Sequence, residues 1–169
     1  MTTEIRDIFV TGLRNAHAME NQALSIVKPQ ISRIENYPAV RERLEMHMRE
    51  TEGQIARLDE ILNGLSESSS TLKDTAMSLG GSMAAVGHAM AGDEIIKNSI
   101  ANFAFENYEI AAYKSLIVMG EHGGFAAAHS LLKQNLDEEI QMASWLEDNL
   151  EKVTLEYMAL SARGETAKV

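Results

Sequence analysis

Apolar residues recur every three or four positions in four long stretches of this chain, and one segment of different composition divides them into two pairs. Such spacing gives an α-helix one continuous apolar face. It predicts helices over about residues 3–34, 38–65, 93–121 and 125–157. Pro29 falls late in the first stretch, where a proline kinks or ends a helix. Because each helix must bury its apolar face against the others, the pattern indicates an all-α bundle of four helices.

The segment from Ser66 to Gly92 separates the second and third predicted helices. It opens with a serine-rich run and contains Gly80 and Gly81. Short helices are expected within it, over about residues 71–79 and 83–90. A connection of about 27 residues is too long for a tight hairpin, so we expect it to cross the bundle. A four-helix bundle with one long crossover is the ferritin-like arrangement.

Length and end composition set the expected domain organisation. With 169 residues the chain has the size of a single domain, which we place over residues 1–160. Residues 161–169 are small and polar, and we expect a frayed tail there. Apolar residues in the crossover, Met83, Val86 and Met90, exceed what a short connection buries and predict a homodimer or higher homo-oligomer.

Composition excludes several classes of function. The chain has no cysteine, which excludes a disulfide scaffold, a thiol nucleophile and cysteine-ligated iron or zinc. Twenty-five acidic against fifteen basic residues give a net charge of −10, which argues against nucleic acid or an anionic membrane as a partner. The sequence shows neither a long uninterrupted apolar run nor the layout of a secretory signal, so we expect a soluble cytoplasmic protein.

Each predicted long helix carries glutamate where its apolar face calls for a core residue. These glutamates are Glu20, Glu50, Glu106, Glu109 and Glu139. One such residue alone is more often a side chain that reaches outward to water. All of them stand near mid-helix, so antiparallel packing brings them to one level, where ionised carboxylates repel each other and lose hydration. Protons, a buried base or a cation must compensate.

A bound cation is the compensation that the sequence favours. No Lys or Arg is found on the inner faces, and a carboxylate-rich site suits iron or manganese, as one ion or as a pair. Two histidines, His17 and His47, each stand three residues before a glutamate, where an imidazole can bind the metal, orient the carboxylate or simply bond to a neighbour. We therefore name further candidates for the ligand set or its surroundings: His17, His47, Gln54 and Tyr113.

Five stretches, in order along the chain, are similar to a known family. They are NAHAME at 15–20, SRIENYP at 32–38, ETEGQ at 50–54, FENYEIAAY at 105–113 and DEEIQMASW at 137–145. The chain thereby resembles the YciE/YciF family of bacterial stress proteins over about residues 5–150, and the YciE branch looks closer. The resemblance implies a ferritin-like fold related to rubrerythrins and a link to stress responses. It also implies metal ligands at Glu20, Glu50, Glu139 and the Glu-x-x-Glu pair Glu106 and Glu109.

Two readings of function follow. The first is a ferritin-like protein that binds one or two iron or manganese ions and handles iron or peroxide under stress. The second is a non-catalytic structural or interaction protein without a functional metal. Di-iron sites of this fold carry a Glu-x-x-His motif on two helices, whereas this chain has Gly53 and Met142 at the histidine positions.

Overall fold

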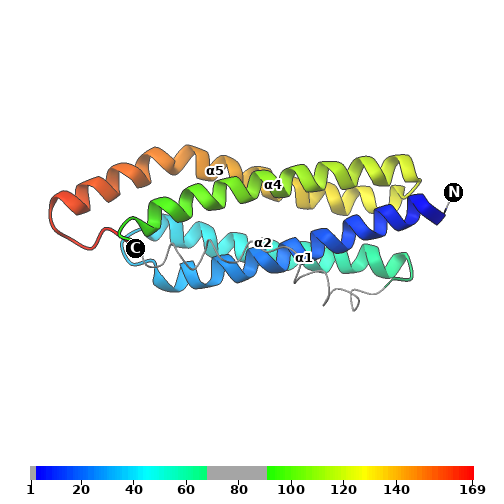
Figure 1. The fold of residues 1–169 in the computed structure, drawn as a ribbon, viewed down its shortest axis with the longest axis horizontal. Helices are drawn as coiled ribbons and strands as arrows, with labels where there is room; N and C mark the ends of the chain where they lie inside the picture. Colours follow the sequence, from blue (N-terminus) through cyan, green and yellow to red (C-terminus); the bar gives the residue numbers. More distant parts are fainter. Residues whose placement is uncertain (1–2, 68–90) are drawn as a thin grey trace.

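A computed structural model of the protein describes residues 3–67 and 91–169, and the described part is an all-α bundle. Its long helices are α1 (Thr3–Arg33), α2 (Pro38–Gly64), α4 (Glu94–Gly123) and α5 (His129–Ala162). A short 3₁₀ turn, η2 (Ala126–Ala128), leads into α5. The helices run along one long axis, with α1 beside α2 in one layer and α4 beside α5 in the other (Figure 1). The predicted fold class is confirmed.

Helix ends follow local sequence signals, with one exception. Pro38 opens α2, and Gly124 ends α4 in the left-handed backbone conformation at φ 78°, which glycine adopts without strain. Pro29, by contrast, does not end α1, which continues to Arg33. Residues on both sides of it, Val27 and Ile34, are buried in the core, and this packing outweighs the hydrogen bond that proline removes.

The core consists of two apolar clusters with a polar layer between them. One cluster joins the first half of α1 to the second half of α2, around Phe9, Leu13 and Leu58. The other joins the second half of α1 to the first half of α2, around Val27 and Leu44. Buried polar side chains lie between the clusters on every long helix: Glu20, His47, Thr51, Gln54, Glu106, Glu109, Asn135 and Glu139. The bundle therefore interrupts its own core at mid-height.

The C-terminal tail is docked, so the expectation that residues 161–169 fray is wrong. The last residues of α5 lie in that range, and the chain then turns back at Gly164, where φ is 69°. The Tyr37 hydroxyl donates to the carbonyl of Ala167 at 2.5 Å, and the backbone N–H of Ile95 donates to the carbonyl of Lys168 at 2.9 Å. The tail thus joins the α1–α2 turn to the start of α4 (Figure 1).

The predicted crossover lies almost wholly outside the described residues. This applies to its expected short helices and to Met83, Val86 and Met90, so the oligomer stays a prediction. No helix among residues 3–67 and 91–169 is both long and apolar enough to cross a membrane.

Candidate metal centre

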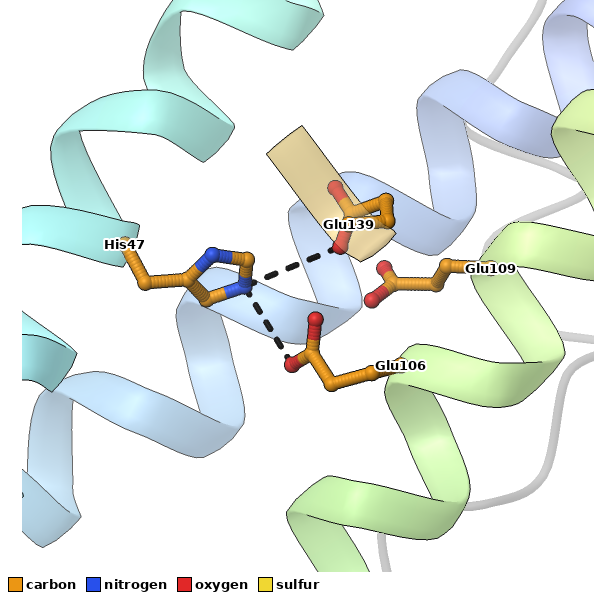
Figure 2. A group of neighbouring side chains, drawn as sticks. All are labelled: His47, Glu106, Glu109 and Glu139. Carbon is orange, nitrogen blue, oxygen red and sulfur yellow. Dashed lines mark ion pairs between the residues drawn. The ribbon is translucent and has the colours of Figure 1, made fainter. Parts of the chain in front are cut away.

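Four buried side chains from three helices converge in the polar layer. His47 comes from α2, Glu106 and Glu109 from α4, and Glu139 from α5 (Figure 2). One ligand atom from each lies within 4.8 Å of the others. Glu106 and Glu109 share a face because they are three residues apart on α4. We call these four residues, which could hold a metal ion, the metal centre.

The imidazole of His47 lies between Glu50 on one side and the carboxylates of Glu106 and Glu139 on the other. Its Nε2 is 3.3 Å from Oε1 of Glu106 and 3.9 Å from Oε2 of Glu139, as the dashed lines in Figure 2 mark. Its Nδ1 is 3.3 Å from Oε2 of Glu50. Nε2 therefore faces the carboxylates of the metal centre, and Nδ1 faces Glu50.

Carboxylate oxygens in the centre are buried without hydrogen-bond partners. Among the described residues, both oxygens of Glu109, both of Glu139 and Oε2 of Glu106 have none. A buried acceptor without a donor costs about 1–3 kcal/mol, and more when it is charged. Such a cluster is stable only if protons or a cation occupy these oxygens.

Burial controls the protonation of the carboxyls. It raises the pKa of Glu109 and of Glu139 well above the usual range, and neighbouring carboxylates add to the effect. Burial also raises the pKa of Glu20 to about 8, although the hydrogen bond from Tyr113 opposes it. Burial alone would lower the pKa of His47, but Glu106 outweighs it and raises that pKa to about 9. Without a metal, protons on these groups therefore offset the charge at neutral pH.

Glu20 lies in the same layer but has its own partner. It is fully buried, and its Oε1 accepts a hydrogen bond from the Tyr113 hydroxyl. Asn135 on α5 donates to that hydroxyl at 2.9 Å and accepts from Arg57 on α2. The predicted ligand Glu20 and the candidate Tyr113 thus belong to a hydrogen-bonded chain next to the metal centre.

Glu50 is paired with a buried arginine, which corrects the expectation that no basic residue lies on the inner faces. Arg43 is 6% exposed, and its Nη1 is 2.9 Å from Oε2 of Glu50. Hydrogen bonds from His47 and Arg43 outweigh burial and lower the pKa of Glu50. The predicted ligand Glu50 is therefore an ionised carboxylate outside the group of four.

The two other candidates have different places. His17 pairs with Asp59 at 3.3 Å and contacts Asn21, so it joins α1 to α2 rather than the centre. Gln54 is fully buried, and neither amide atom has a hydrogen-bond partner within the described part of the chain. Gln54 opposes the rise in the pKa of Glu139 and so borders the metal centre.

Sequence reasoning missed Arg43, Asn135 and Arg57 around the centre. Arg43 is four residues before His47 and seven before Glu50, a spacing that places all three on one face of α2. That signal was sufficient to find it. Asn135 is four residues before Glu139 and shares its face of α5.

Comparison with known proteins identifies the family. The model of a family described as a domain of unknown function (DUF892) matches residues 4–159. The chain belongs to this family. Protein YciF of Escherichia coli strain K12 is 31% identical over 146 residues, which cover 80% of this chain and 83% of YciF. A YciF protein is thus among the relatives of this chain, and the match favours the YciF branch over the expected YciE branch.

Solved structures share the fold. A protein from Xanthomonas campestris pv. campestris matches with a TM-score of 0.80 and 29% identity, covering 94% of this chain and 99% of that one. The crystal structure of the E. coli stress protein YciF matches with a TM-score of 0.71 and 24% identity, covering 89% of this chain and 96% of that one. The chain therefore belongs to the same family as YciF and has the bundle fold of these structures.

The residues of the centre fit a transition-metal ion. Carboxylate oxygens and an imidazole nitrogen are the donors that iron and manganese accept. The unpartnered oxygens of Glu109 and Glu139 supply free lone pairs beside Nε2 of His47. In this chain the imidazole comes three residues before Glu50, rather than three residues after it as in a Glu-x-x-His motif.

Proposed function

We propose that this protein binds iron, or alternatively manganese, in the metal centre of His47, Glu106, Glu109 and Glu139, and that it handles iron or peroxide in bacterial stress. The observation that carries the proposal is the set of buried carboxylate oxygens that no donor among the described residues satisfies. A cation would satisfy them and remove the repulsion between the carboxylates. Kinship with a stress protein, YciF, supports the biological setting.

Each part of the centre has a role in binding. Glu106, Glu109 and Glu139 would supply negative charge and hard oxygen donors, and His47 would supply Nε2 after losing its proton there. Arg43 and Glu50 hold the ring of His47 from its other side. Iron or manganese, once bound, supplies one-electron redox chemistry. The apolar clusters above and below the polar layer keep bulk water away from it.

The test is the metal content of untagged protein and the effect of metal on unfolding. We expect stoichiometric iron or manganese by elemental analysis. At a free metal concentration one hundred times Kd, the ion adds about 2.7 kcal/mol of stability. For a chain of this size that raises Tm by roughly 5–11 °C, and a chelator should abolish the rise.

Glu109→Gln separates binding from folding. The amide is neutral, like the protonated acid of the metal-free protein, so this variant should fold and yet lose the rise in Tm with metal. Glu151→Gln, on the exposed surface of α5, is the matched control and should behave like the wild type. Trace amounts of mixed metals and an unchanged Tm in the wild type would contradict the proposal and favour the structural or interaction protein.

A further inference from the structure

We infer that the metal centre holds a single ion and that Glu50 is a positioning residue, which orients His47 instead of binding the metal. The inference rests on the proposed function and specifies it. It differs from a paired-metal arrangement, in which a carboxylate at this place of the second helix would be a ligand.

The position of Glu50 relative to the His47 ring is the first argument. Oε2 of Glu50 contacts Nδ1 at 3.3 Å, whereas Glu106 contacts Nε2 at 3.3 Å. The two nitrogens of an imidazole point to different sides of the ring. An ion on the Nε2 side, among the other three carboxylates, therefore has the ring between itself and Glu50.

Arg43 is the second argument. Its guanidinium is buried and pairs with the same oxygen of Glu50 that contacts His47. Because arginine keeps its charge at all relevant pH values, a second cation bound by Glu50 would lie beside a fixed positive charge. The charge of Arg43 thus disfavours a second ion at Glu50.

Glu20 is the third argument. A second ion would need more carboxylates than the centre itself offers, and Glu20 is the other buried one nearby. Its Oε1 accepts a hydrogen bond from the Tyr113 hydroxyl, to which Asn135 donates at 2.9 Å, and its Oε2 has no partner among the described residues. One oxygen of Glu20 is thus committed to Tyr113, and Glu50 is committed to His47 and Arg43. The ligand atoms that converge come from three carboxylates and one imidazole, a set for one ion.

Glu50 orients the ring of His47, which lies on the same helix, α2. A carboxylate that accepts the N–H of one ring nitrogen fixes the tautomer and orientation of a metal-binding histidine, and removal of such a partner lowers metal affinity by roughly 10- to 100-fold. Here Glu50 accepts from Nδ1, and Arg43 holds Glu50 in place. Nε2 is thereby directed at Glu106 and Glu139.

The experiment titrates chelator-treated, untagged protein with Mn²⁺, and reads stoichiometry by calorimetry and the electron paramagnetic resonance spectrum at saturation. We expect one ion per chain and the hyperfine pattern of an isolated Mn²⁺. Glu50→Ala should still bind one ion, with affinity lower by roughly 10- to 100-fold. Glu50→Gln should recover part of that loss, because its amide oxygen can accept the Nδ1 proton. Glu42→Ala, an exposed glutamate of the same helix, should match the wild type.

The outcomes distinguish the two proposals. Two ions with a coupled spectrum in the wild type, falling to one in Glu50→Ala, would overturn this inference and leave the proposed function standing. Unchanged affinity in Glu50→Ala would overturn the positioning role of Glu50. A wild-type protein that binds no Mn²⁺, and no Fe²⁺ in a parallel anaerobic titration, would instead overturn the proposed function.

Discussion

Protons held by the buried carboxyls of the polar layer should make the stability of the metal-free protein depend on pH, and Glu20→Gln should remove the contribution of one of these carboxyls. Burial raises the pKa of Glu20 from 4.5 to about 8. Between these two values the folded protein holds a proton that the unfolded chain releases. The free energy of unfolding therefore falls as pH rises through this interval.

The magnitude follows from the size of the shift. Each pKa unit is worth about 1.4 kcal/mol, so Glu20 by itself removes about 3 kcal/mol of stability between about pH 5 and pH 8. His47 acts in the same direction, because its pKa is raised from 6.5 to about 9 and its contribution to stability is lost between these two values. For a chain of this length, about 3 kcal/mol corresponds to a fall in Tm of roughly 6–12 °C.

Thermal unfolding in the presence of chelator, followed by circular dichroism at about pH 5, 6.5 and 8, measures the effect. Glu20→Gln cannot ionise and should lose most of the Glu20 contribution, so at about pH 8 it should be more stable than the wild type. Glu151→Gln, on the surface of α5, should keep the wild-type slope. Wild-type stability that rises with pH over this range, or a Glu20→Gln variant that follows the wild type at every pH, would refute the reasoning.

Two further predictions concern the surroundings of the centre. Tyr113→Phe leaves Glu20 and Asn135 without their shared partner and should cost about 1–3 kcal/mol in chemical denaturation. The Tyr113 hydrogen bond lowers the pKa of Glu20, so its loss should raise that pKa further. The fall in stability with pH should then extend to higher pH. Removing residues 165–169 deprives Tyr37 and the Ile95 N–H of their acceptors, which should also cost about 1–3 kcal/mol. Mn²⁺ affinity should not change, because the tail docks at the start of α4. Glu94 at that end is about three helical turns from Glu106 of the metal centre.

Much of the fold could be predicted from sequence, because helix formation depends on local spacing. The four long helices begin and end within a few residues of the apolar stretches that predicted them. Signals at their ends, such as Pro38 and Gly124, act on the backbone next to them. Pro29 is the exception, since packing of the last turns of α1 lies beyond any local rule.

The carboxylates of the centre were also visible in the sequence. A helix of 3.6 residues per turn places Glu106, Glu109 and Glu139 on core faces, and an antiparallel bundle brings mid-helix positions to one level. Their burial in the structure confirms this part of the interpretation. Periodicity thus determined which carboxylates of the centre are buried in the polar layer.

The tertiary structure alone decided the partners within that layer. Periodicity gives the face of a helix on which a residue lies, but not the rotamer of its side chain or the atom that it meets on another helix. Arg43 and Glu50 share a face of α2, yet only packing shows that their side chains meet beside Nδ1 of His47. Tyr113 reaches Glu20 across the bundle for the same reason.

The position of the C-terminal tail also depends on tertiary contacts and not on its local sequence. Its small and polar residues show no periodic pattern, and in isolation nothing holds them. Their acceptors meet donors of Tyr37 and Ile95, which are far away in sequence and come together only after the helices pack. Local patterns specify the helices and the composition of the centre, whereas contacts between distant residues, formed on folding, decide how its charges are paired.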